Sequence, residues 1–183
     1  MNRAARGISN LDELAGLFYS SPEELGRFDE VAADEMPAEF RRQLAHELHM
    51  TVTVEAFHGC RVDVRVLRKR STPTHYAREI LLLRQSDALV VQHGIMRVNL
   101  AYLDDAVRRE ILAEGTPLGR VLIEHNVMRE IQLNSLWRVT PAARLAKLFD
   151  LEQSSDTYGR TALIHVDGEP AVELVEIVRP LLQ

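Results

Sequence analysis

The feature that most constrains the fold is a set of apolar segments joined in pairs by short polar turns. Residues 77–84 and 88–96 are rich in Leu, Ile and Val, and three polar residues separate them. Residues 160–166 and 171–178 flank Asp167-Gly168, a pair typical of a type I′ turn. Turns this short join antiparallel strands, because a parallel connection needs a crossover of a dozen or more residues. The sequence therefore predicts an antiparallel sheet.

The rest of the chain adds one more predicted hairpin and several helices. Apolar and polar residues alternate over 51–56 and again over 62–66, with His58-Gly59 as the turn between them. A helix over 104–114 is predicted to end at Gly115, and Thr116-Pro117 is predicted to begin the next helix. Other helices are predicted over 40–50 and 141–149, and a strand over 127–139. The predicted class is α+β, a single-domain antiparallel sheet with helices on one face.

The length of 183 residues is that of one ordinary domain. The first 40 residues hold nine acidic and three basic residues, and apolar positions at 11, 14, 17 and 18 recur at helical spacing. We therefore predict an acidic N-terminal helical arm over 1–39 and one domain over 40–183. A solvated acidic surface explains the arm's charge most simply.

Composition argues against several partners. The net charge of −5 makes the chain a poor candidate for general nucleic-acid binding. No apolar run approaches the roughly 20 residues that span a bilayer, and no secretory signal opens the chain. The single Cys60 forms no internal disulfide, which indicates a reducing compartment. The expectation is a cytoplasmic protein with no nucleic-acid partner and no membrane partner; its oligomeric state stays open.

Familiar catalytic and metal-binding motifs are missing from the sequence. It has no Gly-rich phosphate loop and no G-x-S-x-G element. His46 and His49 lie three residues apart in the predicted helix, but two imidazoles make only half of a zinc site. No metal is therefore expected.

Two charged residues stand on apolar faces of predicted strands. Arg78 shares its face with Ile80, and a guanidinium on such a face needs an anion unless it reaches solvent at the strand end. Glu176 shares its face with Leu174, where a carboxylate is paired, protonated or functional. Glu173 lies on the opposite face, and periodicity alone does not decide which of the two acids is buried.

These positions fall in segments that resemble the chorismate pyruvate-lyase family. The most specific segment is 115–120, Gly-Thr-Pro-Leu-Gly-Arg, which is similar to the T-P-L-G-R element that follows a helix in that family. The similarity covers about residues 40–180, and the family's G-R-T element reads Gln92-His93-Gly94 here, with His93 in place of an arginine. The other similar pieces, in the family's order, are 49–51 before a hairpin, the strand 77–82, Tyr158-Gly159-Arg160, Gly168-Glu169-Pro170 and Glu176.

The resemblance implies helical flaps over an internal ligand cavity and a specific chemistry. Members of the family split chorismate into 4-hydroxybenzoate and pyruvate without metal or organic cofactor. By motif, Arg78 would bind the ring carboxylate and Glu176 would hydrogen-bond to the ring hydroxyl. Leu118 and Gly119 would offer backbone N–H groups, and Met50 would line the pocket.

Two functions remain open from the sequence, and both have a small-molecule partner. The predicted function is that of a cofactor-independent carbon–oxygen lyase, an enzyme that forms 4-hydroxybenzoate or a related hydroxybenzoate from chorismate. The alternative is a non-catalytic domain of the same fold that binds an aromatic carboxylate, as in some transcription regulators. The chain shows no evident helix-turn-helix DNA reader, which counts against a complete regulator but not against a free-standing binding domain.

Overall fold

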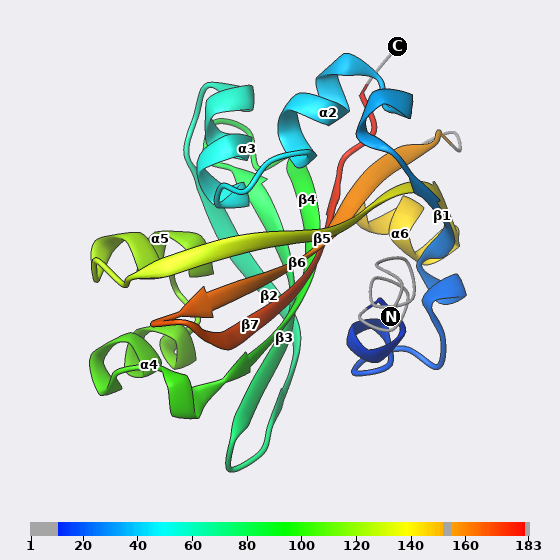
Figure 1. The fold of residues 1–183 in the computed structure, drawn as a ribbon. Coiled ribbons are helices and arrows are strands. Elements are labelled where there is room, and N and C mark those ends of the chain that lie inside the picture. Colours follow the sequence, from blue (N-terminus) through cyan, green and yellow to red (C-terminus); the bar gives the residue numbers. More distant parts are fainter. Residues whose placement is uncertain (1–10, 152–154, 182–183) are drawn as a thin grey trace.

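One antiparallel sheet organises the computed structural model, which describes residues 11–151 and 155–181 (Figure 1). The strand order within this part of the chain is β1-β5-β6-β7-β4-β3-β2. The strands are β1 Gly26–Val31, β2 Val62–Ser71, β3 His75–Arg84, β4 Val90–Asn99, β5 Arg129–Pro141, β6 Thr157–Val166 and β7 Glu169–Val178. The predicted antiparallel α+β class is confirmed.

The hairpins β3–β4 and β6–β7 form where the sequence predicts them. Asp167 and Gly168 have φ angles of 51° and 84°, and a type I′ turn requires positive values at both positions. Strands β4 and β7 pair with each other, so that Gly94 lies between Ile80 on β3 and Glu176 on β7. This pairing of two hairpins places the candidate site residues Arg78 on β3 and Glu176 on β7 in the same region of the sheet.

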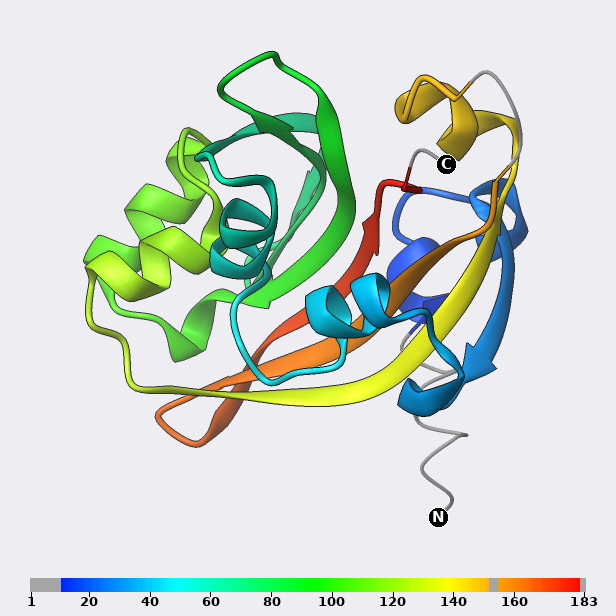
Figure 2. The same cartoon turned by 90° about the horizontal axis from the view of Figure 1, so that it is seen from above.

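Helices cover both faces of the sheet. Their bounds are η1 Pro22–Glu24, η2 Ala33–Glu35, α2 Ala38–Leu44, α3 Met50–His58, η3 Leu100–Tyr102, α4 Asp105–Ala113, α5 Leu118–Glu124 and α6 Ala143–Leu148. Helices α3, α4 and α5 lie on one side of the sheet, and α6 and the helical residues 11–15 lie on the other (Figures 1 and 2). Among the described residues, no helix is long and apolar enough to cross a membrane.

Each face of the sheet has its own core, because successive side chains point to opposite faces. Met96 and Leu174 pack with α4 and α5 on one face. Ile95 and Val175, their neighbours in sequence, pack with α6 and residues 11–19 on the other face. The sequence predicted helices on one face of the sheet. The structure has helices on the second face as well, formed by α6 and residues 11–15.

The predicted hairpin over 51–66 is wrong in its first half, which forms helix α3. Thr and Val residues at 51–54 have branched β carbons and favour strands. In the structure, Met50 and Val54 share a buried helical face that packs with Val62 and Leu82. Gly59 ends the helix with a left-handed φ of 65°. Tertiary packing therefore outweighs local propensity here.

Two smaller details also differ from the sequence-based expectations. Glu114, with a φ of 62°, ends helix α4 in place of Gly115, and α5 begins at Leu118 with Pro117 as its N-cap residue. Within the predicted helical arm, residues 26–31 form strand β1 at the sheet edge. Residues 1–10 of the arm lie outside the described residues, and a domain boundary at residue 39 stays a prediction.

Candidate functional site

A cavity lies between the sheet and helices α3 and α5. The space between its lining side chains is about 550 Å³, a volume that includes the open solvent at its mouth. Most of the lining is apolar, and its side chains with polar groups are His49, Thr51, Arg78, Gln92, Arg160 and Glu176. A few polar groups in an apolar pocket orient a ligand and provide specificity.

The five residues that the resemblance assigns to the site all line this cavity: Met50, Arg78, Leu118, Gly119 and Glu176. Met50 opens α3, and Leu118 and Gly119 open α5. A Cβ on Gly119 would lie 2.9 Å from Oγ1 of Thr51, so glycine lets α5 approach α3 closely. The structure brings these residues together, and their contacts with a ligand stay predictions.

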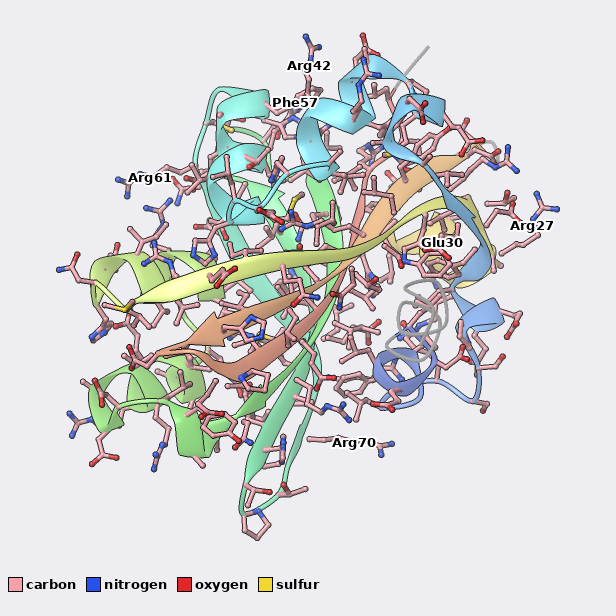
Figure 3. The ribbon with its side chains drawn as sticks, in the orientation of Figure 1. Arg27, Glu30, Arg42, Phe57, Arg61 and Arg70 are labelled. Atoms are coloured by element: carbon pink, nitrogen blue, oxygen red, sulfur yellow. The ribbon has the colours of Figure 1, made fainter. Side chains whose placement is uncertain are left out.

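Arg78 points from β3 into the cavity and is only 1% exposed. Its Nη2 donates a hydrogen bond to the carbonyl oxygen of Thr116 at 3.3 Å. Within the described part of the chain, its Nε and Nη1 have no hydrogen-bond partner. Burial lowers the pKa of the Arg78 guanidinium, and the nearby Tyr76 and Glu114 offset part of this change. Arg27, Arg42 and Arg61, which Figure 3 labels, in contrast point away from the protein body.

Glu176 is paired rather than free. It is 7% exposed, and Nε of Arg160 on β6 donates to its Oε2 at 2.8 Å. Arg160 is 1% exposed, and its other two nitrogens donate to the carbonyl oxygens of His46 at 2.9 Å and Leu48 at 3.0 Å. Arg160 therefore connects the cavity carboxylate to the segment between α2 and α3.

The alternation of β4 and β7 decides which neighbouring residues reach the cavity. Glu173 pairs with Arg97, Oε2 to Nε at 2.5 Å, and does not line the cavity. His93, which replaces the family's arginine, lies 2.9 Å from Glu79 on the opposite face of the sheet. Gln92 and Gly94 line the cavity in its place.

The two histidines considered as metal ligands have protein partners. His49 lines the cavity and accepts a hydrogen bond from Nε of Arg129. Burial, with the charges of Arg129 and Arg160, lowers the pKa of His49 to about 4, so its ring is neutral at pH 7. Nε2 of His46 lies 2.6 Å from the carbonyl oxygen of Gln43. The described residues contain no group of three potential ligands that could hold a metal ion.

Sequence reasoning missed Arg160 and Gln92 as site residues. Arg160 stands in the Tyr-Gly-Arg segment that carries part of the resemblance, and it faces Glu176 only because β6 pairs with β7. Gln92 is two residues from Gly94 on β4, so it points to the same face of the sheet. Its position in the cavity depends on the packing of α3 over that face.

Comparison with known proteins shows the fold. No protein-family model matches the chain, and no curated protein matches it. PhnF from Mycobacterium smegmatis is similar at a TM-score of 0.54 and 12% identity, over 75% of this chain and 66% of that chain. The effector domain of PhnF gives a TM-score of 0.53 at 11% identity, over 72% of this chain and 88% of that one. A GntR-family transcriptional regulator from Bacillus cereus gives 0.45 at 9% identity, over 65% and 92%.

The two PhnF structures show that this chain shares the fold of the PhnF effector domain. Membership of the chorismate pyruvate-lyase family itself stays a prediction.

Proposed function

We propose that this chain is a non-catalytic domain that binds a small aromatic carboxylate. The observation that carries the proposal is Arg78, whose buried guanidinium faces an apolar cavity with two nitrogens that have no partner among the described residues. Buried guanidinium N–H groups without an acceptor cost free energy, and a carboxylate matches the two-pronged geometry of a guanidinium. An apolar ring between the carboxylate and the remaining cavity wall fits the aliphatic lining.

The fold is also that of a domain whose description suggests ligand binding. The PhnF structure that matches over most of its own length is described as an effector domain. Because one fold carries many functions, the function depends on the residues of the site.

Calorimetry with 4-hydroxybenzoate tests the proposal. Arg78→Ala should weaken binding by about 2–5 kcal/mol, or about 30-fold or more, because it removes a buried charged hydrogen bond. Arg78→Lys should recover only part of the affinity, since an ammonium lacks the planar fork. Arg65→Ala, at an exposed position on β2, is the matched control. Unchanged affinity in a folded Arg78→Ala variant would exclude Arg78 from the site.

A second candidate function is elimination of pyruvate from chorismate. It is favoured by the convergence on one cavity of the five residues that the resemblance assigns to a lyase site. Incubation of the protein with chorismate, with measurement of pyruvate and of the aromatic product, tests it. Turnover that survives dialysis against a chelator and disappears in Arg78→Ala would support a metal-independent lyase. Binding of 4-hydroxybenzoate without release of pyruvate would leave the non-catalytic function.

A further inference from the structure

At the end of the cavity away from Arg78, the side-chain oxygen of Gln92 receives no hydrogen bond from the described residues. Gln92 is 2% exposed and lines the cavity. Its Nε2 lies 3.5 Å from Oε1 of Glu176, a long hydrogen bond that nevertheless orients the amide, because a carboxylate oxygen can only accept. Gln92 Oε1 is then left without a hydrogen-bond partner among residues 11–151 and 155–181. A buried acceptor in this state can take a hydrogen bond from a donor on a ligand or from water.

The charges at this end of the cavity are already balanced. Glu176 faces Arg160 at 2.8 Å, and all three nitrogens of that guanidinium donate to protein oxygens. Three of the five N–H donors of Arg160 are thereby used, and Nη1 also lies 3.3 Å from Nδ1 of His46. The negative charge of Glu176 is answered as well, so this end does not require a cationic ligand group.

The order of residues along β4 defines how a ligand lies. Met96 is paired with Arg78, and Gly94 and Gln92 follow on the same face at two-residue intervals. At about 3.4 Å per residue, Gln92 stands roughly 14 Å along the strand from the Arg78 pair, measured between backbones. Gly94 has no side chain between these two ends. A ring can therefore lie over Gly94 with its carboxylate toward Arg78 and its far edge toward Gln92.

We propose that Gln92 determines specificity, selecting ligands with one negative charge and an uncharged hydrogen-bond donor, such as a ring hydroxyl, at the end opposite the carboxylate. This inference rests on the proposed function, since it takes Arg78 as the carboxylate site. It also predicts discrimination against dicarboxylates, because a second carboxylate would meet the acceptors of Gln92 and Glu176.

Calorimetry on the full chain with four probes tests the inference: benzoate, 3-hydroxybenzoate, 4-hydroxybenzoate and benzene-1,4-dicarboxylate. At least one hydroxybenzoate should bind about tenfold more tightly than benzoate, and the dicarboxylate should bind more weakly than benzoate. Gln92→Leu should reduce the affinity for that hydroxybenzoate to the benzoate level and leave benzoate affinity unchanged. Gln132→Leu, at an exposed position on β5, is the matched control.

The outcomes separate this inference from the proposed function. Equal affinities for benzoate and both hydroxybenzoates, or a dicarboxylate that binds as tightly as the best of them, would overturn the role of Gln92. If Arg78→Ala still abolished binding in that case, the carboxylate site would stand. If none of the four probes bound, both proposals would fail. Because equal affinities on the unaltered protein would by themselves overturn the role of Gln92, the inference can be refuted even if Gln92→Leu does not fold.

Discussion

Arg160→Met is expected to destabilise the domain strongly, because it removes the cation from a buried ion pair. The side chains of Arg160 and Glu176 are 1% and 9% exposed, so water does not replace the lost partner. The substitution also takes a donor from the carbonyl oxygens of His46 and Leu48. Methionine fills much of the same volume, so the loss is electrostatic rather than a cavity effect.

Removing one partner of a buried ion pair costs about 3–5 kcal/mol, because the remaining charge has no counterion. In a domain of this length, 1 kcal/mol corresponds to roughly 2–4 °C in the thermal midpoint. The midpoint of Arg160→Met should therefore fall by about 6–20 °C. Adding Glu176→Leu should restore part of the loss, since it removes the stranded carboxylate.

Thermal unfolding followed by tryptophan fluorescence measures these effects, because Trp137 is the single tryptophan of the sequence and is buried. Arg65→Met, at an exposed position on β2, controls for the change of residue type. A midpoint for Arg160→Met equal to that of the control would refute the reasoning. So would a double variant that loses as much stability as both single variants added together.

Three other predictions concern space and pH. Gly94→Ala should leave the thermal midpoint nearly unchanged, because its Cβ would lie no closer than 3.4 Å to any neighbour, whereas Gly94→Leu should abolish 4-hydroxybenzoate binding in calorimetry. Gly119→Ala should lower the free energy of unfolding in urea by about 1–3 kcal/mol, because its Cβ would press on Thr51. Burial raises the pKa of Glu79, but its hydrogen bonds lower it to about 2 from an ordinary 4.5. Because the pKa of Glu79 is lower in the folded state than in the unfolded state, ionised Glu79 stabilises the fold above about pH 4.5, and this contribution is lost as the pH falls towards 2. Glu79→Gln should therefore flatten the dependence of the urea midpoint on pH.

The hairpins could be predicted from the sequence because their signals are local. Alternating apolar residues and the Asp167-Gly168 turn specify β6 and β7 without reference to the rest of the chain. Strand β1 has no such signal, since Arg27, Asp29 and Glu30 interrupt any apolar pattern in this edge strand. Its pairing with β5 depends on backbone hydrogen bonds that composition does not reveal.

The candidate site could be predicted only in part, for a related reason. Arg78 and Glu176 were recognisable as charges on apolar strand faces, and the resemblance added Met50, Leu118 and Gly119. The partner of Glu176 was not recognisable, because Arg160 stands opposite it on the adjacent strand, and the register of that pair of strands is known only from the folded sheet.

The alternation of side chains gives neighbouring residues on β3 and β4 separate tasks. Arg78 and Gln92 face the cavity, whereas Glu79 and His93 face each other on the opposite side, where Glu79 also accepts hydrogen bonds from Tyr19 and Arg68. The second group fixes the N-terminal segment to the sheet. Substitutions at 79 and 93 should therefore change stability, and substitutions at 78 and 92 should change ligand binding. A one-residue error in register would exchange these two sets of effects, so the four positions together provide a test of the strand assignment itself.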